Sequence, residues 1–589
     1  MAVASENAAS LPYHEPGIVL ILVFSSFLLL LNVINAILDG VLYCGLLGQV
    51  LIGIAWGTPG AKWLSAEVEE NLVQLGYLGL ILLVYEGGLH TSFQSLKANL
   101  LLSSGVALTG ICIPIGLSYT LQGLLDATPV QAFAAGAALC STSLGTTFTV
   151  LGSSGLSSSR LGVVLTSAAM MDDVVGLVMV QVISNLGGEN FNAITIIRPV
   201  LVSIAFAVVA PVACLFVLKP VTLWLNRYRE THPSAALNDL LRKTQTAFTF
   251  HTALLVALVA GASYAGTSNL FAAYIAGATI SWWDSEVPHT DTVTKARSAP
   301  PKGKSEATTS SSDASSGYIA GPSNRKDATA SRTPAESAQA AQPTQAADLH
   351  EEIDKLCGAA IYEQYYYQAV SKILQPLFFA SIGFSIPITR MFRGAIVWRG
   401  IVYTILMAFA KIVCGLWLVR LSVAPMKTVR RLLKEFKFPS IPHLWGKSKA
   451  EVTASQVSTT TPIGPPTAET VAAPSAPTSS CERRSSPSPA KPLSIHPPLI
   501  LALAMCARGE IGFLISAVAE SNGIFSPSGV TSSDPSDIFL VVTWAIVLCT
   551  IIGPLGVGLS VRRVKKLQDR KNKQQEGAGR DVLGVWGVE

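Results

Sequence analysis

Residues 168–176 of the chain read Ala-Ala-Met-Met-Asp-Asp-Val-Val-Gly. The two adjacent carboxylates, Asp172 and Asp173, lie in the apolar run Leu161 to Leu186, which has no other ionisable residue. This run is long enough to cross a bilayer as a helix. An aspartate near the middle of such a helix costs at least about 2.5 kcal/mol unless it meets water, an ion or a counter-charge. The stretch therefore predicts a functional site inside a membrane helix.

The adjacency of the two aspartates predicts that they have different partners. Neighbouring side chains on a helix point about 100° apart, so Asp172 and Asp173 cannot easily share one counter-charge. We therefore expect the two carboxylates to have different roles.

The composition is that of a polytopic membrane protein. Of the 589 residues, 50% are hydrophobic and 13% are charged, and the mean hydropathy is +0.46. The net charge of +5 lies mostly in loops and the C-terminal tail, where it indicates membrane topology; nucleic acid is not an expected partner. The nine cysteines show neither metal-ligand spacing nor a disulfide framework, and no cofactor or resident metal is expected.

The apolar runs predict an all-α protein of about thirteen transmembrane helices, each run being long enough for a span. The first run exceeds the apolar part of a signal peptide and is expected to remain as a helix. The runs are Gly17 to Leu38, Val41 to Gly57, Leu72 to Leu89, Leu100 to Leu121, Pro129 to Leu151, Leu161 to Leu186, Val200 to Leu225, Phe248 to Tyr264, Leu270 to Trp283, Ile373 to Ile388, Ile401 to Val419, Pro498 to Ala519 and Ile538 to Val561.

The charges of the connecting loops predict an outside or luminal N-terminus and a cytoplasmic C-terminus. An odd number of spans is needed for this arrangement. It places on the cytoplasmic side Lys219, Arg227, Arg229, Arg242, Lys243, Lys427, Arg430, Arg431, Lys434, Lys437 and the tail residues 562–566, and on the other side the acidic loop 67–70, with Arg390, Arg393 and Arg399 as exceptions.

Two polar segments, 285–349 and 448–494, are rich in Ser, Thr, Pro and Ala. They have too few large apolar residues to order themselves, and both are expected in the cytoplasm. Residues 351–369 contain four tyrosines, which favours an interfacial helix. The chain is expected to begin with a membrane part of about nine helices (residues 1–284), followed by a polar loop (285–349) and by an interfacial segment with two membrane helices (350–420). A loop that is first basic and then polar (421–497), the last two membrane helices (498–561) and a tail (562–589) are expected to follow.

A second intramembrane charge, Lys411, lies in the run Ile401 to Val419. It is about nine residues from either end of the run, roughly 14 Å at 1.5 Å per residue. A lysine stem reaches only about 6 Å, so it cannot bring the ammonium group to the headgroups. Lys411 therefore needs a buried anion, unless the helix is short or bent and brings it to an interface.

Two further polar clusters predict interrupted helices. Residues 507–512, Ala-Arg-Gly-Glu-Ile-Gly, place Arg508 and Glu510 beside glycines midway along a span, as expected where a helix unwinds and lines a polar cavity. These two charges can serve transport directly or form a structural ion-pair network. In the fifth span, Thr142 and Ser143 offer hydroxyl ligands for a monovalent cation, although ordinary helix packing also uses such residues. Glu86 and His251 lie near span ends and are expected to be structural.

The sequence does not favour an enzyme. Residues 152–155, Gly-Ser-Ser-Gly, match the nucleophile motif of rhomboid proteases, but no suitable later histidine accompanies them. Intramembrane aspartyl proteases need carboxylates that face each other from separate helices, and adjacent aspartates do not supply that geometry. No phosphate-binding Gly-rich loop is present to drive pumping by ATP.

The polar motifs together resemble the sodium(potassium)/proton exchanger superfamily, particularly its bacterial-like second cation:proton antiporter branch. The resemblance rests on the order of five features: Ser-Thr-Ser-Leu-Gly at 141–145, Asp172-Asp173, Pro-Leu-Phe-Phe at 376–379 with Gly383, Lys411, and residues 507–512. The two long polar loops depart from the compact bacterial pattern and indicate a fungal member.

This resemblance implies an inverted-repeat fold with two broken helices, the fifth and twelfth spans, that cross near the midplane. It implies a homodimer in which a six-helix core moves against a fixed dimerisation domain. By the same resemblance, Asp173 binds the cation or the proton, Asp172 pairs with Lys411, and Thr142 and Ser143 lie by the crossing. Electrogenic exchange is implied by the Asp-Asp pair together with the lysine.

The predicted function is secondary exchange of Na⁺ or K⁺ for H⁺ by alternating access, with Li⁺ as a third cation to test. A carboxylate that is partly desolvated and near another anion can bind either a proton or a cation. Two alternatives remain: a proton-uncoupled cation channel or ligand-gated K⁺ efflux pathway, and a membrane scaffold or sensor. The sequence is compatible with the plasma membrane or an endomembrane such as the Golgi, endosome or vacuole.

Overall fold

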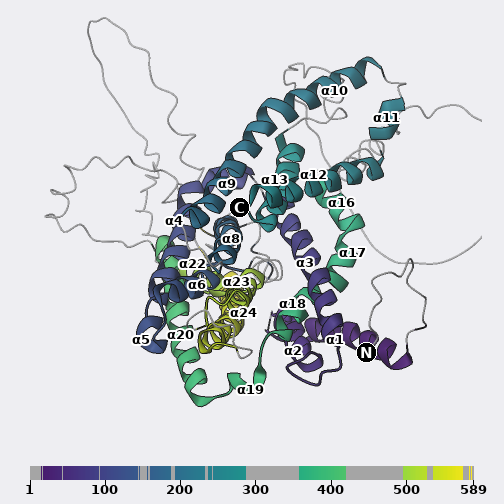
Figure 1. Cartoon of the computed structure of the whole chain (residues 1–589). Helices are drawn as coiled ribbons and strands as arrows, with labels where there is room; N and C mark the ends of the chain where they lie inside the picture. Colours follow the sequence, from purple (N-terminus) through teal and green to yellow (C-terminus); the bar gives the residue numbers. More distant parts are fainter. Residues whose placement is uncertain are drawn as a thin grey trace, which may run out of the picture.

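Every element of the computed structural model that we describe is helical (Figure 1). The structure describes residues 15, 17–42, 44–91, 93–143, 145, 156, 159–187, 193–232, 236–241, 243–286, 357–419, 495–526, 535–574, 583 and 586. The two polar segments predicted as loops fall almost entirely outside these residues. The all-α fold class is confirmed.

In the described residues, the helices follow the predicted apolar runs, and several runs contain a series of shorter helices. In the first part of the chain they are α1 (Ile18–Leu42), α2 (Gly45–Trp56), α3 (Ala66–Leu89), α4 (Phe93–Ser118), α5 (Leu121–Leu125), α6 (Pro129–Ala138), α8 (Arg160–Leu186), α9 (Ala193–Ala213), η1 (Cys214–Leu218), α10 (Lys219–Thr231), α11 (Ala236–Leu241), α12 (Thr244–Ala265) and α13 (Asn269–Glu286).

The second part begins with a nearly continuous helical series that runs from α16 to α18. Its elements are α16 (Gly358–Tyr365), α17 (Tyr367–Ala369), η2 (Val370–Leu374), α18 (Gln375–Phe384), α19 (Ile388–Met391), α20 (Gly394–Ile412), η3 (Val413–Leu418), α22 (His496–Cys506), α23 (Glu510–Ser521) and α24 (Asp537–Gln574).

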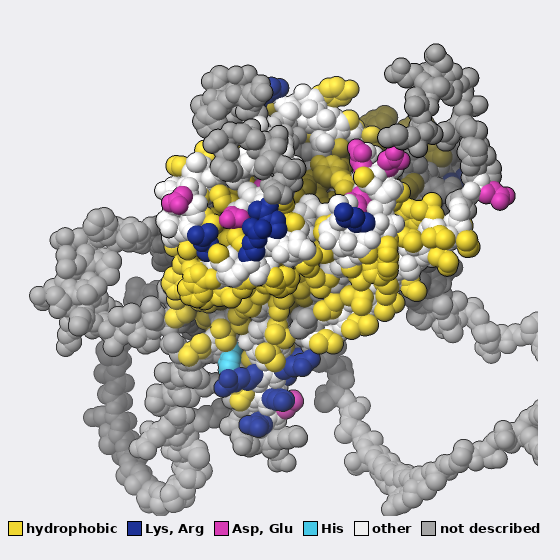
Figure 2. All heavy atoms as spheres, turned by 60° about the horizontal axis from the view of Figure 1, so that its bottom comes forward, with side chains coloured by type: hydrophobic (Ala, Val, Ile, Leu, Met, Phe, Trp, Pro, Cys, Tyr) yellow, Lys and Arg dark blue, Asp and Glu magenta, His cyan; other side chains and the backbone are white. Residues whose placement is uncertain are grey.

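Nine of the described helical segments are long and apolar enough to cross a membrane. On the face shown in Figure 2, hydrophobic side chains form a broad band, with charged clusters beyond both edges. Such a band is expected where helices face lipid. The protein is therefore an integral, multi-pass membrane protein, and the count of thirteen spans stays a prediction, since α2, α6, α13 and α18 are not among the nine.

The predicted interruption of the twelfth span is confirmed, and the described part of the fifth span ends its helix where the break is predicted. Helix α6 ends at Ala138, and residues 141–143 are not helical. Residues 507–509 are likewise unwound between α22 and α23. The two unwound segments are hydrogen-bonded to each other, since the Ser143 amide donates to the Ala507 carbonyl at 3.1 Å. Gly512 permits this crossing, since a Cβ there would lie 2.8 Å from the Ala138 carbonyl oxygen.

The spans form two groups (Figure 1). One group packs α1, α2, α3 and α18 together, and the other packs α4, α6, α8, α20, α22, α23 and α24 around the crossing. Helix α13 contacts α3 most extensively and also α8. Both interrupted helices belong to the second group, so the expected polar site lies at the centre of one bundle.

The helix expected within residues 351–369 is present from Gly358, and its interfacial placement stays a prediction. Tyr362 is buried, and its ring centroid lies 6.0 Å from that of Tyr85 on α3. The start of this helix is held by α13, because Asp284 Oδ2 accepts a hydrogen bond of 2.7 Å from the Gly358 amide. The end of α13 and the start of α16 therefore lie side by side, although residues 287–357 separate them in the sequence.

This contact predicts that the segment between α13 and α16 can be shortened. Replacing residues 289–354 by about ten Gly and Ser residues, a flexible coil long enough to join neighbouring points, is expected to leave the thermal midpoint of the purified protein within a few degrees of the wild-type value. Asp284→Ala is the matched control, because it removes a helix-capping acceptor worth about 1 kcal/mol. Aggregation of the shortened chain on size exclusion would show that the segment is needed for folding.

Candidate functional site

Helix α8 carries both aspartates into the protein interior. Its start is capped by Ser159, whose hydroxyl accepts from the Gly162 amide, and the helix runs without a break to Leu186. Asp172 is 0% and Asp173 is 5% exposed. Burial of two carboxylates on one helix requires that each be neutralised, hydrogen-bonded or hydrated.

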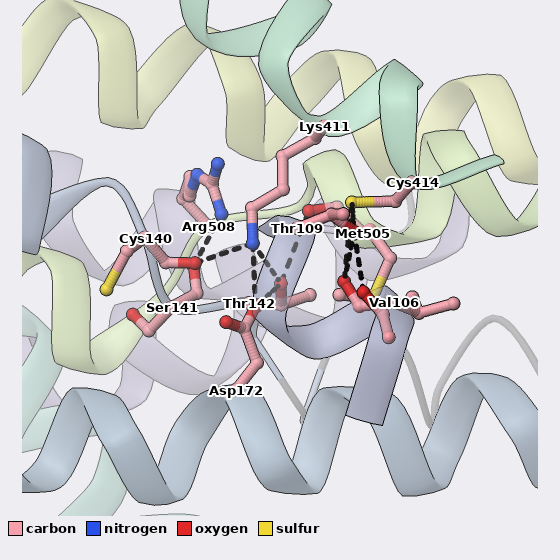
Figure 3. Close-up of polar contacts among 11 residues, drawn as sticks. Val106, Thr109, Cys140, Ser141, Thr142, Asp172, Lys411, Cys414, Met505 and Arg508 are labelled. Carbon is pink, nitrogen blue, oxygen red and sulfur yellow. Dashed lines mark hydrogen bonds and ion pairs between the residues drawn. The ribbon is translucent and has the colours of Figure 1, made fainter. Parts of the chain in front are cut away.

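Asp172 is held by two side chains from other parts of the chain, Lys411 and Thr142 (Figure 3). Its Oδ2 lies 2.7 Å from Lys411 Nζ on α20 and accepts a hydrogen bond of 2.5 Å from the Thr142 hydroxyl. Thr142 belongs to the unwound strand after α6. One carboxylate oxygen therefore ties α8, α20 and the first broken helix together.

Lys411 has a full set of acceptors, although its side chain is 0% exposed. Its ammonium group donates to the Cys140 carbonyl at 2.5 Å, to the Thr142 hydroxyl at 3.1 Å and to Asp172 at 2.7 Å. An ammonium group has three N–H donors, so all three are used. Lys411 is thus buried with its counter-ion, as its distance from the ends of the span predicts.

Asp173 lies on a different side of α8, where it lines a cavity of about 310 Å³. Glu510 and Ile511, at the start of α23, line the same cavity, as do Gln49 and Tyr274 from the opposite side. None of the described residues that line it is a lysine or an arginine. Asp173 therefore faces a polar space without the cation that neutralises Asp172.

The cavity runs between the two groups of helices toward one end of the molecule. The residues that line its outer part include Asp39 near the end of α1, Glu86 in the last turn of α3 and His90 just beyond it. The His90 side chain is 53% exposed. Carboxylates along such a passage raise the local concentration of cations.

Glu510 is the first residue of α23 and is 7% exposed. Its Oε2 accepts a hydrogen bond of 3.2 Å from the Ser143 hydroxyl. A carboxylate at this position is also favoured by the positive end of the helix dipole. Ser143 and Glu510 thus join the two broken helices on the side that faces Asp173.

Arg508 has a different environment from Glu510. Its guanidinium is fully buried and Nη1 donates to the Ser141 carbonyl at 2.5 Å, while its own carbonyl accepts from the Thr550 hydroxyl at 2.9 Å. Among the described residues, no ion pair joins Arg508 to Glu510. Arg508 therefore holds the two crossing segments together, whereas the Glu510 side chain lines the cavity.

Several polar residues of the cavity were not predicted from the sequence. Gln49 is 3% exposed on the otherwise apolar α2, and it could have been found as an isolated amide in a membrane span. Asp39 and Glu86 lie at helix ends, where a charge is unremarkable in sequence. Glu86 was expected to be structural, and the structure places it in the cavity wall.

Comparisons with known proteins agree with this architecture. The family model "Sodium/hydrogen exchanger, transmembrane" matches residues 20–298, which include Thr142, Ser143, Asp172 and Asp173. Over this part, slightly less than half of its length, the chain is similar to the sodium/hydrogen exchanger family. The similarity favours a membrane transporter over an enzyme.

Individual antiporters match shorter stretches. The chain is 31% identical over 152 residues to the Na⁺/H⁺-K⁺ antiporter GerN of Bacillus cereus, covering 26% of this chain and 39% of GerN. It is 30% identical over 140 residues to the high-affinity Na⁺/H⁺ antiporter NhaS3 of Synechocystis, covering 23% of this chain and 30% of that protein. The matched part of the chain thus spans well under half of these relatives.

One solved structure of similar extent is the sodium proton antiporter MjNhaP1 from Methanocaldococcus jannaschii. The sequence identity is 12% and the TM-score is 0.48, over 93% of this chain and 99% of the other.

The pair of Asp172 and Lys411 can be tested by a double-variant cycle. Lys411→Met leaves a buried carboxylate without its cation and is expected to destabilise the protein by about 3–5 kcal/mol. Asp172→Asn combined with Lys411→Met is expected to lose less stability than the sum of the two single changes. Thermal unfolding in one detergent measures all three variants.

A surface pair provides the control for this cycle. Arg390 lies 4.0 Å from the half-exposed Asp537, and a surface pair contributes about 0–1 kcal/mol. Arg390→Met is therefore expected to shift the midpoint little. Additive effects of Lys411→Met and Asp172→Asn would contradict a direct energetic coupling between the two residues.

Proposed function

We propose that the protein is a secondary active antiporter that exchanges Na⁺ or K⁺ for H⁺, with Asp173 as the carboxylate that binds either ion. The observation that carries this proposal is the unequal environment of two adjacent aspartates. Lys411 and Thr142 hold Asp172 within the bundle, whereas Asp173 lines the cavity together with Glu510. One carboxylate is thus available to a mobile cation.

Competition at Asp173 follows from its surroundings. A buried carboxylate is stabilised by any positive charge that neutralises it, whether this is a bound proton or a metal ion. Glu510 adds negative charge to the same cavity, so both cargoes are attracted. Hydroxyl and carboxylate oxygens suit a hard monovalent cation, and Ser143 and Glu510 supply both kinds beside the crossing.

Alternating access is supported by the position of the cavity between the two groups of helices. It reaches the ends of α1 and α3, which are cytoplasmic if the N-terminus is outside or luminal, as the loop charges predict. The structure then corresponds to a cytoplasm-facing state. The bundle around the crossing reorients when Asp173 carries a proton or a cation, and it stays in place while the carboxylate is bare.

The names of the matched relatives supply the substrates of the proposal. GerN is a Na⁺/H⁺-K⁺ antiporter and NhaS3 a Na⁺/H⁺ antiporter, and we extend exchange of Na⁺ or K⁺ for H⁺ to this chain, with Li⁺ to be tested. A homodimer in the plasma membrane or an endomembrane completes the proposal, together with a cytoplasmic C-terminus.

The decisive variant is Asp173→Asn. It removes the ionisable group without changing the side chain's size, so cation-dependent proton flux in proteoliposomes is expected to be lost while the amount of folded protein stays normal. The assay imposes a pH gradient and adds Na⁺, K⁺ and Li⁺ in turn. Asp126→Asn, at an exposed turn where asparagine suits the left-handed backbone of φ 51°, is the matched control and is expected to exchange normally.

Other outcomes of this assay separate the alternatives. Exchange that persists in Asp173→Asn removes the proposed role of this carboxylate. Cation flux that is independent of the proton gradient in the wild-type protein identifies a channel. Absence of any flux in the wild-type protein, with loss of cellular function only on deletion of the polar loops, identifies a scaffold or sensor.

Electrogenic exchange is a separate expectation. If more protons than cations move in each cycle, an imposed membrane potential acts on the net charge by about 2.3 kcal/mol per 100 mV. The initial exchange rate in proteoliposomes is therefore expected to rise with a potential of one sign and to fall with the other. Equal rates at both signs and at zero potential would show electroneutral exchange.

A further inference from the structure

Leu583 and Trp586, close to the C-terminus, are buried against the membrane helices. They are 3% and 6% exposed, although both follow the end of the last helix, α24, at Gln574. The Trp586 amide donates to the Leu583 carbonyl at 3.4 Å, so a hydrogen bond joins the two residues. Burial of a tryptophan removes more apolar surface from water than that of most side chains.

The two residues join a cluster that belongs to the bundle around the crossing. Its other buried members come from α4, the beginning of α8, η3, α22 and α24. No member of this cluster comes from α1, α2, α3 or α18 among the described residues. Leu583 and Trp586 therefore contact one group of helices.

The most specific contact is made at the first residue of α8. The Arg160 guanidinium carbon lies 5.2 Å from the centroid of the Trp586 ring, within the range of a cation–π interaction. Leu161, the next residue, is 0% exposed in the same cluster. Trp586 thus covers the beginning of the helix that carries Asp172 and Asp173.

We propose that Leu583 and Trp586 dock intramolecularly on the start of α8 and position this helix within the bundle around the crossing. The consequence for transport rests on the proposed antiporter function. Asp172 must stay within reach of Lys411 and Thr142, which lie on two other elements, and a fixed α8 maintains that contact. The two docked residues act through α8 and touch neither the cation nor the proton.

The docking itself is tested without any transport assay. In the full chain, a photo-crosslinking benzoylphenylalanine replaces Trp586, and irradiated membranes are analysed by mass spectrometry. Cross-links within one chain to residues near Arg160, or to the end of α24, are expected. Cross-links to lipid, to a second copy or to no protein group would overturn the docking. Asp173→Asn is expected to cross-link normally, so failure of the antiporter assignment is distinguishable from failure of the docking.

The positioning role is tested by exchange in proteoliposomes. Trp586→Ala and Arg160→Met are expected to lower the maximal exchange rate about two- to fivefold, the range that loss of a partly exposed cation–π contact implies, and to leave the half-saturating cation concentration unchanged. Trp586→Phe and Arg160→Lys preserve an aromatic ring and a cation, and they are expected to retain at least half of the wild-type rate.

A second tryptophan controls for general effects of removing a large side chain. Trp224 on α10 is 66% exposed and lies outside the cluster, so Trp224→Ala is expected to exchange at the wild-type rate. Wild-type rates in Trp586→Ala, or a changed half-saturating concentration with an unchanged maximal rate, would overturn the positioning role. Size exclusion of every variant identifies misfolding. If Trp586→Ala misfolds, the exchange rates of Trp586→Phe and Arg160→Lys decide the outcome.

Discussion

The ion pair between Asp172 and Lys411 is the constraint on which the bundle around the crossing depends. Both side chains are fully buried, and they are 2.7 Å apart. Two charges in a low-dielectric interior are tolerated only when each meets the other and the remaining donors and acceptors are largely satisfied. Thr142 and the Cys140 carbonyl complete the set around the ammonium group. Helices α8 and α20 and the first broken helix must therefore pack in one relative arrangement.

This arrangement separates two carboxylates that are neighbours in sequence. Because adjacent side chains leave a helix in different directions, fixing Asp172 toward Lys411 turns Asp173 toward the cavity and Glu510. Lys411 thus neutralises one aspartate, and under the proposed function the other remains for an exchangeable cation. The structural pair and the proposed transport site are two consequences of one helical geometry.

Much of this architecture could be predicted from the sequence because charge in a membrane span is rare and must be compensated. Asp172, Asp173 and Lys411 could be found by that rule alone, and the breaks at 141–143 and 507–509 by glycines and polar residues within apolar runs. The cavity wall could not be predicted in the same way. Gln49, Asp39 and Glu86 meet Asp173 only through the packing of α1, α2 and α3 against the other bundle, and no local pattern shows which helix ends come together.

The broken helices explain why two cationic side chains, Lys411 and Arg508, and the carboxylate of Glu510 gather at one crossing. A helix that ends inside the membrane leaves carbonyl groups without partners and carries partial negative charge there, whereas one that begins there exposes amide groups and partial positive charge. Beyond the end of α6, Lys411 binds the Cys140 carbonyl and Arg508 binds the Ser141 carbonyl. At the start of α23, Glu510 supplies the anion. Each charge thus compensates a helix end that water would otherwise solvate, so the same residues that stabilise the interrupted backbone also set the electric field at Asp173.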